Sequence, residues 1–284
     1  MPESAPMADL EAAPAAERIR ITILGCGASP GTPRIGNDWG ACDPSEPKNR
    51  RTRAAILIDA FRADRAIPTR ILVDTGPDMR NQLLDARVDR LDAVLYTHGH
   101  ADHTHGIDDL RCFWLNTRRR VPIYTDDATQ QRLEEAFGYC FRAPDGGGYP
   151  PILTRHAIAA GTRFSIDGPG GRVSILPFRQ VHGDIDSLGF RIGAFAYSSD
   201  VSALPDDSVA ILGRLSLWIA DALRWRPHPS HFSVAETIAW HDRLRPRRTI
   251  FTHMHGDLDY RTLMAQLPGD IEPGFDGMAV DVPL

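Results

Sequence analysis

The chain has 284 residues and a formal net charge of −5, and 42% of its residues are hydrophobic. This composition predicts a soluble globular protein with a core of its own. It excludes a membrane-spanning helix, since no run of eighteen apolar residues occurs, and the negative charge argues against a protein that coats nucleic acid. The four cysteines are widely spaced and no secretory signal is visible, so we expect a cytoplasmic protein with reduced thiols.

The first half of the chain alternates strand-like and helix-like segments. Residues 1–17, rich in Ala, Pro and Glu, are predicted to be a disordered tail, and 18–284 a single domain. After a first strand at 19–24 comes a Gly/Pro-rich loop at 25–40. Further strands are predicted at 53–59, 69–76, 91–97 and 121–126. Helices are predicted at 77–86, 107–114 and 130–140, the last opened by a capping box at 127–130.

The second half repeats this organisation after a loop at 142–151. Strands are predicted at 173–180, 187–199 and 248–253, and helices at 234–244 and 259–267. A capping box at 233–236 opens the first of these helices. The run at 214–223 fits a buried strand or a short helix equally well. Grouped strands with helices between and after them predict a layered α/β fold in two similar halves.

The segment THGHADH at 97–103 concentrates metal-binding side chains directly after a buried strand. His98 and His100 are two residues apart and can converge on one ion. Asp102 and His103 follow in the next turn and must point elsewhere, because one short turn cannot place four ligands around a single metal. The spacing therefore predicts two adjacent metal sites.

Two adjacent sites need further ligands from distant segments. His182, Asp200 and His253 each stand where a predicted strand ends. In layered α/β folds, binding sites gather at the ends of strands. These three residues are therefore the expected additional ligands.

Several motifs, in this order, resemble the metallo-β-lactamase superfamily. They are THGHADH (97–103), QVHGD (180–184), YSSD (197–200), HFSVAE (231–236) and TH (252–253). The resemblance covers nearly the whole chain after residue 18. It is to the phosphodiesterase branch, which contains ribonuclease Z and, closer in its motifs, the phosphoribosyl 1,2-cyclic phosphate phosphodiesterase. It implies a single-domain, four-layer αββα sandwich with a dinuclear metal site on its edge.

Carried over position by position, the resemblance assigns a ligand set to two divalent ions, Zn or Mn. His98, His100 and His182 would hold the first ion. Asp102, His103 and His253 would hold the second. Asp200 would bridge both ions, and water activated between them would attack phosphorus as hydroxide. Asp74, in the run LVDTG, is expected to orient a ligand histidine from outside the ligand set.

The resemblance also indicates candidates for the chemistry itself. His231 would serve as general acid at the leaving group, or would stabilise charge on the phosphoryl group. His228 and His255 are the alternatives for this role. Asp102 is expected to be catalytic as well as a metal ligand. Glu236 is better explained as part of the capping box at 233–236. Arg111 could contact a substrate phosphate, and a surface ion pair is the other explanation for it.

Two features separate the chain from its nearest relatives. It has no CxxC or CxC pair, so we expect no third, structural zinc of the kind that the phosphonate-pathway enzyme carries. The loop at 142–151 is too short to be the arm with which ribonuclease Z grips tRNA.

The Gly-rich run GCGASPG has the wrong spacing for a dinucleotide-binding fingerprint, and prolines follow where a helix would start.

These observations predict a dinuclear phosphodiesterase for a small, cyclic or linear, nucleotide or sugar phosphodiester. Its partner is a small substrate, with no membrane and no stable nucleic-acid complex, and a homodimer is left open. The alternatives are a lactonase or thioesterase that uses the same ligands, a tRNA-processing nuclease, and a non-catalytic metal or nucleotide sensor. The complete ligand set disfavours the sensor, and HFSVAE disfavours the lactonase.

Overall fold

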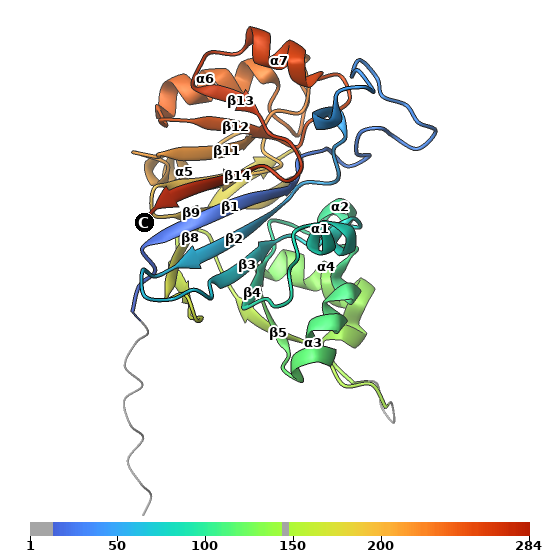
Figure 1. Cartoon of the computed structure of the whole chain (residues 1–284), viewed down its shortest axis with the longest axis vertical. Coiled ribbons are helices and arrows are strands. Elements are labelled where there is room, and N and C mark those ends of the chain that lie inside the picture. Colours follow the sequence, from blue (N-terminus) through green and yellow to red (C-terminus); the bar gives the residue numbers. More distant parts are fainter. Residues whose placement is uncertain (1–13, 144–147) are drawn as a thin grey trace, which may run out of the picture.

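Two seven-stranded β-sheets form the centre of the computed structural model, which describes residues 14–143 and 148–284 (Figure 1). The first sheet has the order β14-β1-β2-β3-β4-β5-β6, with bounds Ala279–Pro283, Arg18–Gly25, Ala55–Phe61, Thr69–Val73, Ala93–Leu95, Val121–Thr125 and Leu153–Ala157. The second has the order β13-β12-β11-β10-β9-β8-β7, with bounds Ile271–Pro273, Thr249–Thr252, Leu217–Asp221, Phe195–Ser198, Ile185–Ile192, Val173–His182 and Phe164–Ile166.

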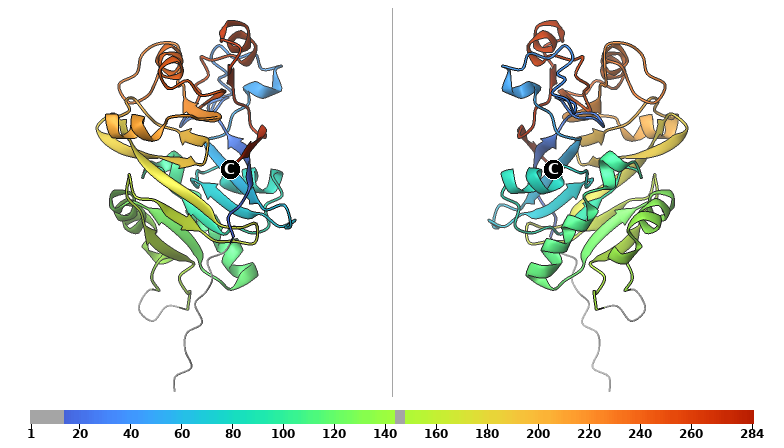
Figure 2. Two further views of the ribbon diagram at one scale, coloured as in Figure 1. Left: turned by 90° about the vertical axis from the view of Figure 1, so that its left-hand side faces the viewer. Right: turned by 90° about the vertical axis from the view of Figure 1, so that its right-hand side faces the viewer.

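The helices lie on the outer faces of the two sheets (Figures 1 and 2). The helices that follow strands of the first sheet are α1 Met79–Asp85, α2 Ala101–Thr104, α3 Arg111–Thr117 and α4 Asp127–Phe137. Those of the second half are α5 Asp206–Ile211, α6 Val234–Leu244 and α7 Tyr260–Gln266. The layers are helix, sheet, sheet and helix, which confirms the predicted αββα sandwich.

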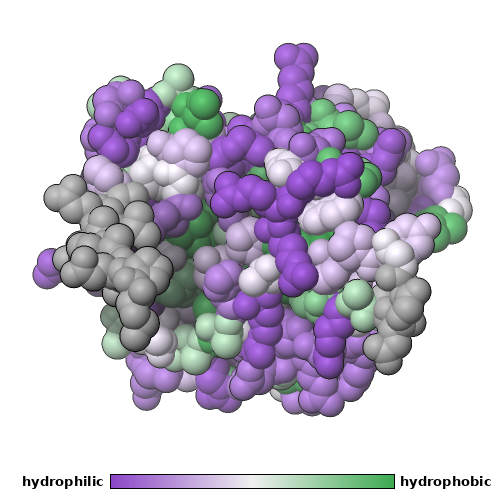
Figure 3. All heavy atoms as spheres, turned by 90° about the horizontal axis from the view of Figure 1, so that it is seen from below, coloured by the Kyte–Doolittle hydropathy of each residue, from purple (hydrophilic) through white to green (hydrophobic). Residues whose placement is uncertain are grey.

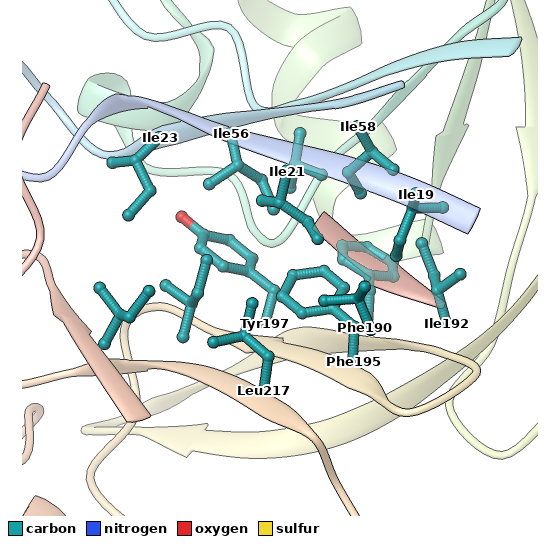
Figure 4. Packing of buried hydrophobic residues seen from close by; sticks show 14 of the residues in the cluster. Ile19, Ile21, Ile23, Ile56, Ile58, Phe190, Ile192, Phe195, Tyr197 and Leu217 are labelled. Carbon is teal, nitrogen blue, oxygen red and sulfur yellow. The ribbon is translucent and has the colours of Figure 1, made fainter. Parts of the chain in front are cut away.

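Alternating side chains decide which face of each strand is inside. Ile19, Ile21 and Ile23 of β1 point into the space between the sheets, where they meet Phe190 of β9 and Phe195 of β10 (Figure 4). Successive side chains of a strand point to opposite faces, so every second residue joins this inner core. The period-two pattern therefore fixes how the two sheets pack.

The outer faces carry smaller cores beneath the helices. Leu57 and Leu72 of the first sheet pack with Leu83 of α1 and Leu133 of α4. On the second sheet, Trp218 belongs to the corresponding cluster that α6 covers. Each sheet is thus apolar on both faces, as a sheet covered on both sides must be.

The structure resolves or corrects several local predictions. The ambiguous run at 214–223 contains strand β11, buried along its length. The capping box at Ser233 is confirmed, with both reciprocal bonds to Glu236. The box predicted at 127–130 is wrong by one position: Asp126 is the N-cap of α4 and accepts a hydrogen bond from the Thr129 amide. Asp126 and Asp127 are both possible N-cap residues from the sequence alone. The extended backbone of Asp126 makes it the N-cap, because an N-cap residue is not itself helical.

Four residues of the predicted disordered tail, 14–17, can be placed in the structure. The amide of Ala16 donates to the Arg172 carbonyl, that of Glu17 donates to the Phe61 carbonyl, and Ala16 is buried in the inner core. Residues 14–17 are therefore part of the folded domain. Residues 1–13, and residues 144–147 of the loop at 142–151, lie outside the described residues.

The strand directions bring many chain segments to one edge of the sandwich. In the first sheet β3, β4, β5 and β6 run parallel, and in the second β10, β11, β12 and β13 do so. Strand β8 is antiparallel to β9, and β9 to β10, so β8 also ends at this edge. The carboxyl ends of such strands are where α/β folds place their ligands.

Across the described part of the chain, no helix is both long and apolar enough to cross a membrane. The face seen in Figure 3 is mainly hydrophilic, with hydrophobic residues scattered between the polar ones. Scattered apolar residues of this kind are normal on the surface of a protein in water.

The inner core should dominate the stability of the fold. Ile58 on β2 is fully buried, so Ile58→Ala should lower the free energy of unfolding by about 2–5 kcal/mol. Ile35 is 100% exposed, and Ile35→Ala should change the free energy of unfolding by less than about 0.5 kcal/mol. Equilibrium denaturation in excess metal measures both variants, and equal losses would contradict this packing.

Candidate metal centre

Three histidine nitrogens converge at the open edge of the sandwich. His98 and His100 follow β4, and His182 is the last residue of β8. His98 Nε2 lies 2.9 Å from His100 Nδ1, and His182 Nε2 lies 3.3 Å from the same atom. Their ring nitrogens lie close enough together to hold one ion. Both sheets contribute to this group.

A second group lies beside the first. Asp102 Oδ2 is 3.5 Å from His103 Nε2 and 3.6 Å from His253 Nε2. Asp102 and His103 belong to α2, whereas His253 follows β12 of the other sheet. These three ligand atoms also lie within reach of a single ion. The side chains of THGHADH thus fall into two neighbouring groups of potential ligands.

Asp200 lies between the two groups and contacts both. Its Oδ2 is 3.1 Å from His103 Nε2, and its Oδ1 is 3.3 Å from His253 Nε2. On the other side, Oδ1 is 3.7 Å from His182 Nε2 and 4.0 Å from His98 Nε2. The side chain is 3% exposed. One buried carboxylate therefore faces all the buried histidines of the cluster.

The ring nitrogens that face away from the cluster are held by other groups. His103 Nδ1 donates to Asp74 Oδ2 at 2.7 Å, and His182 Nδ1 donates to the Ser230 carbonyl at 2.7 Å. These bonds fix the tautomers and leave each Nε2 directed inward. Asp74 also accepts hydrogen bonds from the amide and hydroxyl of Thr97, next to His98.

The inward nitrogens fit the role of metal ligands. Within residues 14–143 and 148–284, His103 Nε2 and His253 Nε2 are buried and have no hydrogen-bond partner. An unpaired buried polar atom costs about 1–3 kcal/mol. A bound cation would satisfy these atoms, and imidazole with carboxylate is a donor set that Zn and Mn accept.

The backbone is strained where three of these residues leave their strands. Asp74, Asp200 and His253 have φ angles of 66°, 56° and 55°. This left-handed region is uncommon for residues other than glycine and costs about 1–3 kcal/mol at each position. The sharp turn at each strand end directs the side chain into the centre.

Burial and proximity shift the pKa values of the cluster in opposing directions. Burial favours the neutral carboxyl of Asp200, but His103 and His253 outweigh it and hold the Asp200 pKa well below its usual range. Burial disfavours protonated His253, yet the carboxylates of Asp200 and Asp102 raise its pKa to about 9. Imidazole binds a metal only after losing its proton, so metal uptake here would release protons and weaken as the pH falls.

His231 lies against this centre and has a partner that sequence reasoning missed. Its ring stacks 4.8 Å from that of His253 and lies 4.7 Å from that of His182. Its Nδ1 donates to Asp221 Oδ2 at 2.7 Å, and Asp221 is fully buried at the end of β11. The available signal was a carboxylate that ends an apolar run, LWIAD, as Asp74 does in LVD.

The remaining candidates from the sequence, His228, His255 and Arg111, lie outside the two ligand groups. The His228 ring is 5.2 Å from that of His231, and its Nδ1 accepts from the Ser230 amide at 3.3 Å. His255 Nδ1 faces Asp257 Oδ1 at 3.2 Å. Arg111 forms a 2.7 Å ion pair with Asp108. The second explanation for Arg111, an ion pair at the surface, is the arrangement that the structure contains.

The cysteines lie apart from the candidate ligands. Cys26 is buried, and its thiol donates to Asp276 Oδ1 at 3.4 Å. Burial, with the nearby Asp276 carboxylate, raises the Cys26 thiol pKa well above its usual value. Among the described residues, no group that could hold a metal ion contains a cysteine.

Comparison with known proteins identifies the family. The sequence model of the Beta-lactamase superfamily domain matches residues 69–254, more than half of the chain. A crystal structure of a new diphosphatase from the PhnP family aligns with a TM-score of 0.83 and 33% sequence identity, over 94% of this chain and 98% of that one. The chain belongs to the metallo-β-lactamase superfamily, and within it to the PhnP family.

Two curated proteins are also similar in sequence. An octanoyltransferase of Porphyromonas gingivalis is 31% identical over 267 residues, which are 92% of this chain and 51% of that protein. A ribonuclease Z of Bradyrhizobium diazoefficiens is 32% identical over 148 residues, 51% of this chain and 46% of that protein. The chain thus spans about half the length of the curated relatives it matches.

The metallo-β-lactamase fold and the His/Asp groups at its edge are those of a metal-dependent hydrolase. Its relatives include a diphosphatase of the PhnP family and ribonuclease Z enzymes. The predicted superfamily and fold are therefore confirmed.

Because Asp200 faces both groups, its loss should affect every bound ion. Asp200→Ala is expected to lower the total metal content of the purified protein by more than half, whereas loss of a ligand to one ion should spare the other. Elemental analysis after dialysis measures this. Asp186→Ala, which removes an exposed partner of Arg179, is the matched control and should retain all metal. Full metal content in the Asp200 variant would remove this residue from the centre.

Proposed function

We propose that the enzyme is a dinuclear phosphodiesterase acting on a small, cyclic or linear, nucleotide or sugar phosphodiester. The observation that carries this proposal is the position of Asp200 between two ligand groups, 3.1 Å from His103 Nε2 on one side and 3.7 Å from His182 Nε2 on the other. Two-ion centres with a shared carboxylate are suited to displacement at phosphorus, because they neutralise the attacking and leaving oxygens together.

In this proposal the two groups hold one divalent ion each, Zn or Mn, with Asp200 shared. The first ion's ligands are His98, His100 and His182, and the second ion's are Asp102, His103 and His253. When bound, such ions supply a water of lowered pKa as the nucleophile and neutralise the phosphoryl oxygens. The Asp74 carboxylate orients His103 for this purpose through a 2.7 Å hydrogen bond.

Asp102 has a second part in the proposed reaction. Burial favours its neutral form, but His103 and His253 outweigh this and hold the Asp102 pKa well below its usual range. An ionised carboxylate is an acceptor only, so Asp102 can orient an attacking water by accepting one of its protons in a hydrogen bond. Its side chain is 14% exposed, which leaves it accessible from the open edge.

His231 is the proposed general acid for the departing oxygen. Asp221 accepts a hydrogen bond from Nδ1–H, so that the protonated ring can give its other proton, on Nε2, to the departing oxygen. Asp221 Oδ2 also accepts a 3.0 Å hydrogen bond from the Val201 amide, and this bond fixes the carboxylate in place. The arrangement supports proton delivery by a positioned imidazole whose orientation is set by a buried acid. Asp221 acts through His231, so it is a positioning residue.

Acyl hydrolysis or acyl transfer is a second candidate. It is favoured by the similarity to the Porphyromonas gingivalis protein named octanoyltransferase. That name describes a protein of which the match covers only 51%, whereas the diphosphatase of the PhnP family is covered over 98%. A phosphoryl substrate therefore has the stronger support. Turnover of a lactone or thioester without turnover of any phosphodiester would reverse this order.

Substitution of the proposed acid should separate metal binding from chemistry. His231→Ala should keep the metal and lower kcat/KM about 10²–10⁴-fold on a nucleoside 2′,3′-cyclic phosphate, whose ribose oxygen needs a proton to leave. On bis(p-nitrophenyl) phosphate the loss should be small, because nitrophenolate leaves as an anion. Steady-state kinetics on both esters, with metal analysis, measure the difference.

Two further variants control this experiment. Asp221→Asn should show the same preference for the nitrophenyl ester, since it disturbs only the orientation of His231. His228→Ala should behave like the wild type on both esters. Equal losses on both esters in the His231 variant would point to charge stabilisation instead of proton transfer. A loss confined to the His228 variant would move the acid to that residue.

A further inference from the structure

The chain segment that follows His253, residues 254–258, packs against a loop that is distant in the sequence. This loop, residues 26–53, follows β1 and lies beside α7 (Figure 1). The Ala41 amide of the loop donates a 2.8 Å hydrogen bond to the Gly256 carbonyl. Backbone contacts therefore join the loop to the residues directly after a proposed metal ligand.

One buried cation, the guanidinium of Arg51, joins the same two segments through a side chain. Arg51 is 1% exposed. Its Nη2 donates to the Leu258 carbonyl at 2.6 Å, and its Nη1 donates to the His255 carbonyl at 3.3 Å. The Leu258 amide also donates to the His255 carbonyl, which closes a turn at 255–258. Arg51 thus holds both ends of this turn with one planar group.

The surroundings of Arg51 make its charge costly. Among the described residues, every hydrogen-bond partner of the guanidinium is uncharged: the two backbone carbonyls, the Asn49 side-chain oxygen at 3.3 Å and the Cys42 thiol at 4.0 Å. The Asp259 carboxylate bonds the other end of the Asn49 side chain at 2.7 Å, so it compensates the charge from a distance. An apolar side chain of similar size would avoid the cost of burying a charge. The stability of the loop alone therefore does not explain an arginine here.

His253 depends on its backbone for its orientation. Its φ angle is 55°, and its buried Nδ1 has no hydrogen-bond partner within the described part of the chain. By contrast, the rings of His103 and His182 are held through Nδ1, by Asp74 and by the Ser230 carbonyl. A strained backbone persists only where the surrounding structure holds it. The direction of the His253 ring is therefore set by the residues that follow it.

We propose that Arg51 is a positioning residue for His253. By fixing the turn at 255–258, its guanidinium holds the left-handed backbone of His253 in the conformation that directs Nε2 toward the second ion. The inference rests on the proposed two-ion centre and goes beyond it, because it names a residue outside the ligand set that sets the affinity of one ion. The first ligand group has no member in this segment, so the loss of Arg51 should weaken one ion and spare the other.

The test measures the two ions separately. In His100→Ala the first ligand group is incomplete, and in Asp102→Ala the second is incomplete. Competition with a chromophoric zinc chelator gives the dissociation constant of the ion that each purified variant retains. Arg51→Met added to His100→Ala should weaken the retained ion by about 10–100-fold, the usual effect of losing support behind a metal-bound histidine. The same substitution added to Asp102→Ala should change the dissociation constant by less than about twofold.

Two further variants control this experiment. Arg51→Lys keeps the charge without the planar fork, so it should show a smaller loss confined to the same ion, and it carries the test if Arg51→Met does not fold. Ile58→Ala weakens the core without altering the turn at 255–258, so it should leave both dissociation constants within about twofold. This comparison separates positioning from a general loss of stability.

Three outcomes would overturn the assignment of Arg51 while the two-ion centre stands. They are equal weakening of both ions, weakening confined to the first ion, and no weakening of either. If the protein without substitutions binds fewer than two zinc ions, the proposed centre itself fails, and the assignment of Arg51 fails with it.

Discussion

The buried carboxylate of Asp200 is the constraint on which the rest of the centre depends. It follows β10 of the second sheet, yet it lies 3.1 Å from His103 of α2, the helix that follows β4 of the first sheet. A negative charge with 3% of its side chain exposed is tolerated only when it is paired. The imidazoles around it meet that need, and divalent cations would meet it more fully. The two sheets must therefore be packed face to face, with their strand ends aligned, before the ligands can come together.

This dependence couples metal binding to folding. The inner core between the sheets, with Ile21, Phe190 and Phe195, sets the register that brings the strand ends together. Strained backbone at Asp200 and His253 opposes the folded state locally. Ions that bind only the folded protein would offset that cost and stabilise it by mass action. The same ions would link the two halves of the sandwich at its open edge.

The sequence predicts those ligands whose positions follow from the spacing of a motif or from the end of a strand. The spacing in THGHADH allows only two adjacent groups, and the strand-end positions of His182, Asp200 and His253 indicate which distant residues can join them. Strand β11 was ambiguous because a strand buried on both faces has no period-two signal. The Asp221–His231 pair joins residues from β11 and a later loop, and only the packed structure brings them together.

The most direct test of a two-ion centre is anomalous X-ray diffraction from crystals of the protein grown with Mn or Zn. A two-ion centre should give two anomalous peaks about 3.5–4 Å apart, with the Asp200 carboxylate between them. One peak should lie among His98, His100 and His182, and the other among Asp102, His103 and His253. A single peak under saturating metal, or a second peak that Asp200 does not touch, would contradict it.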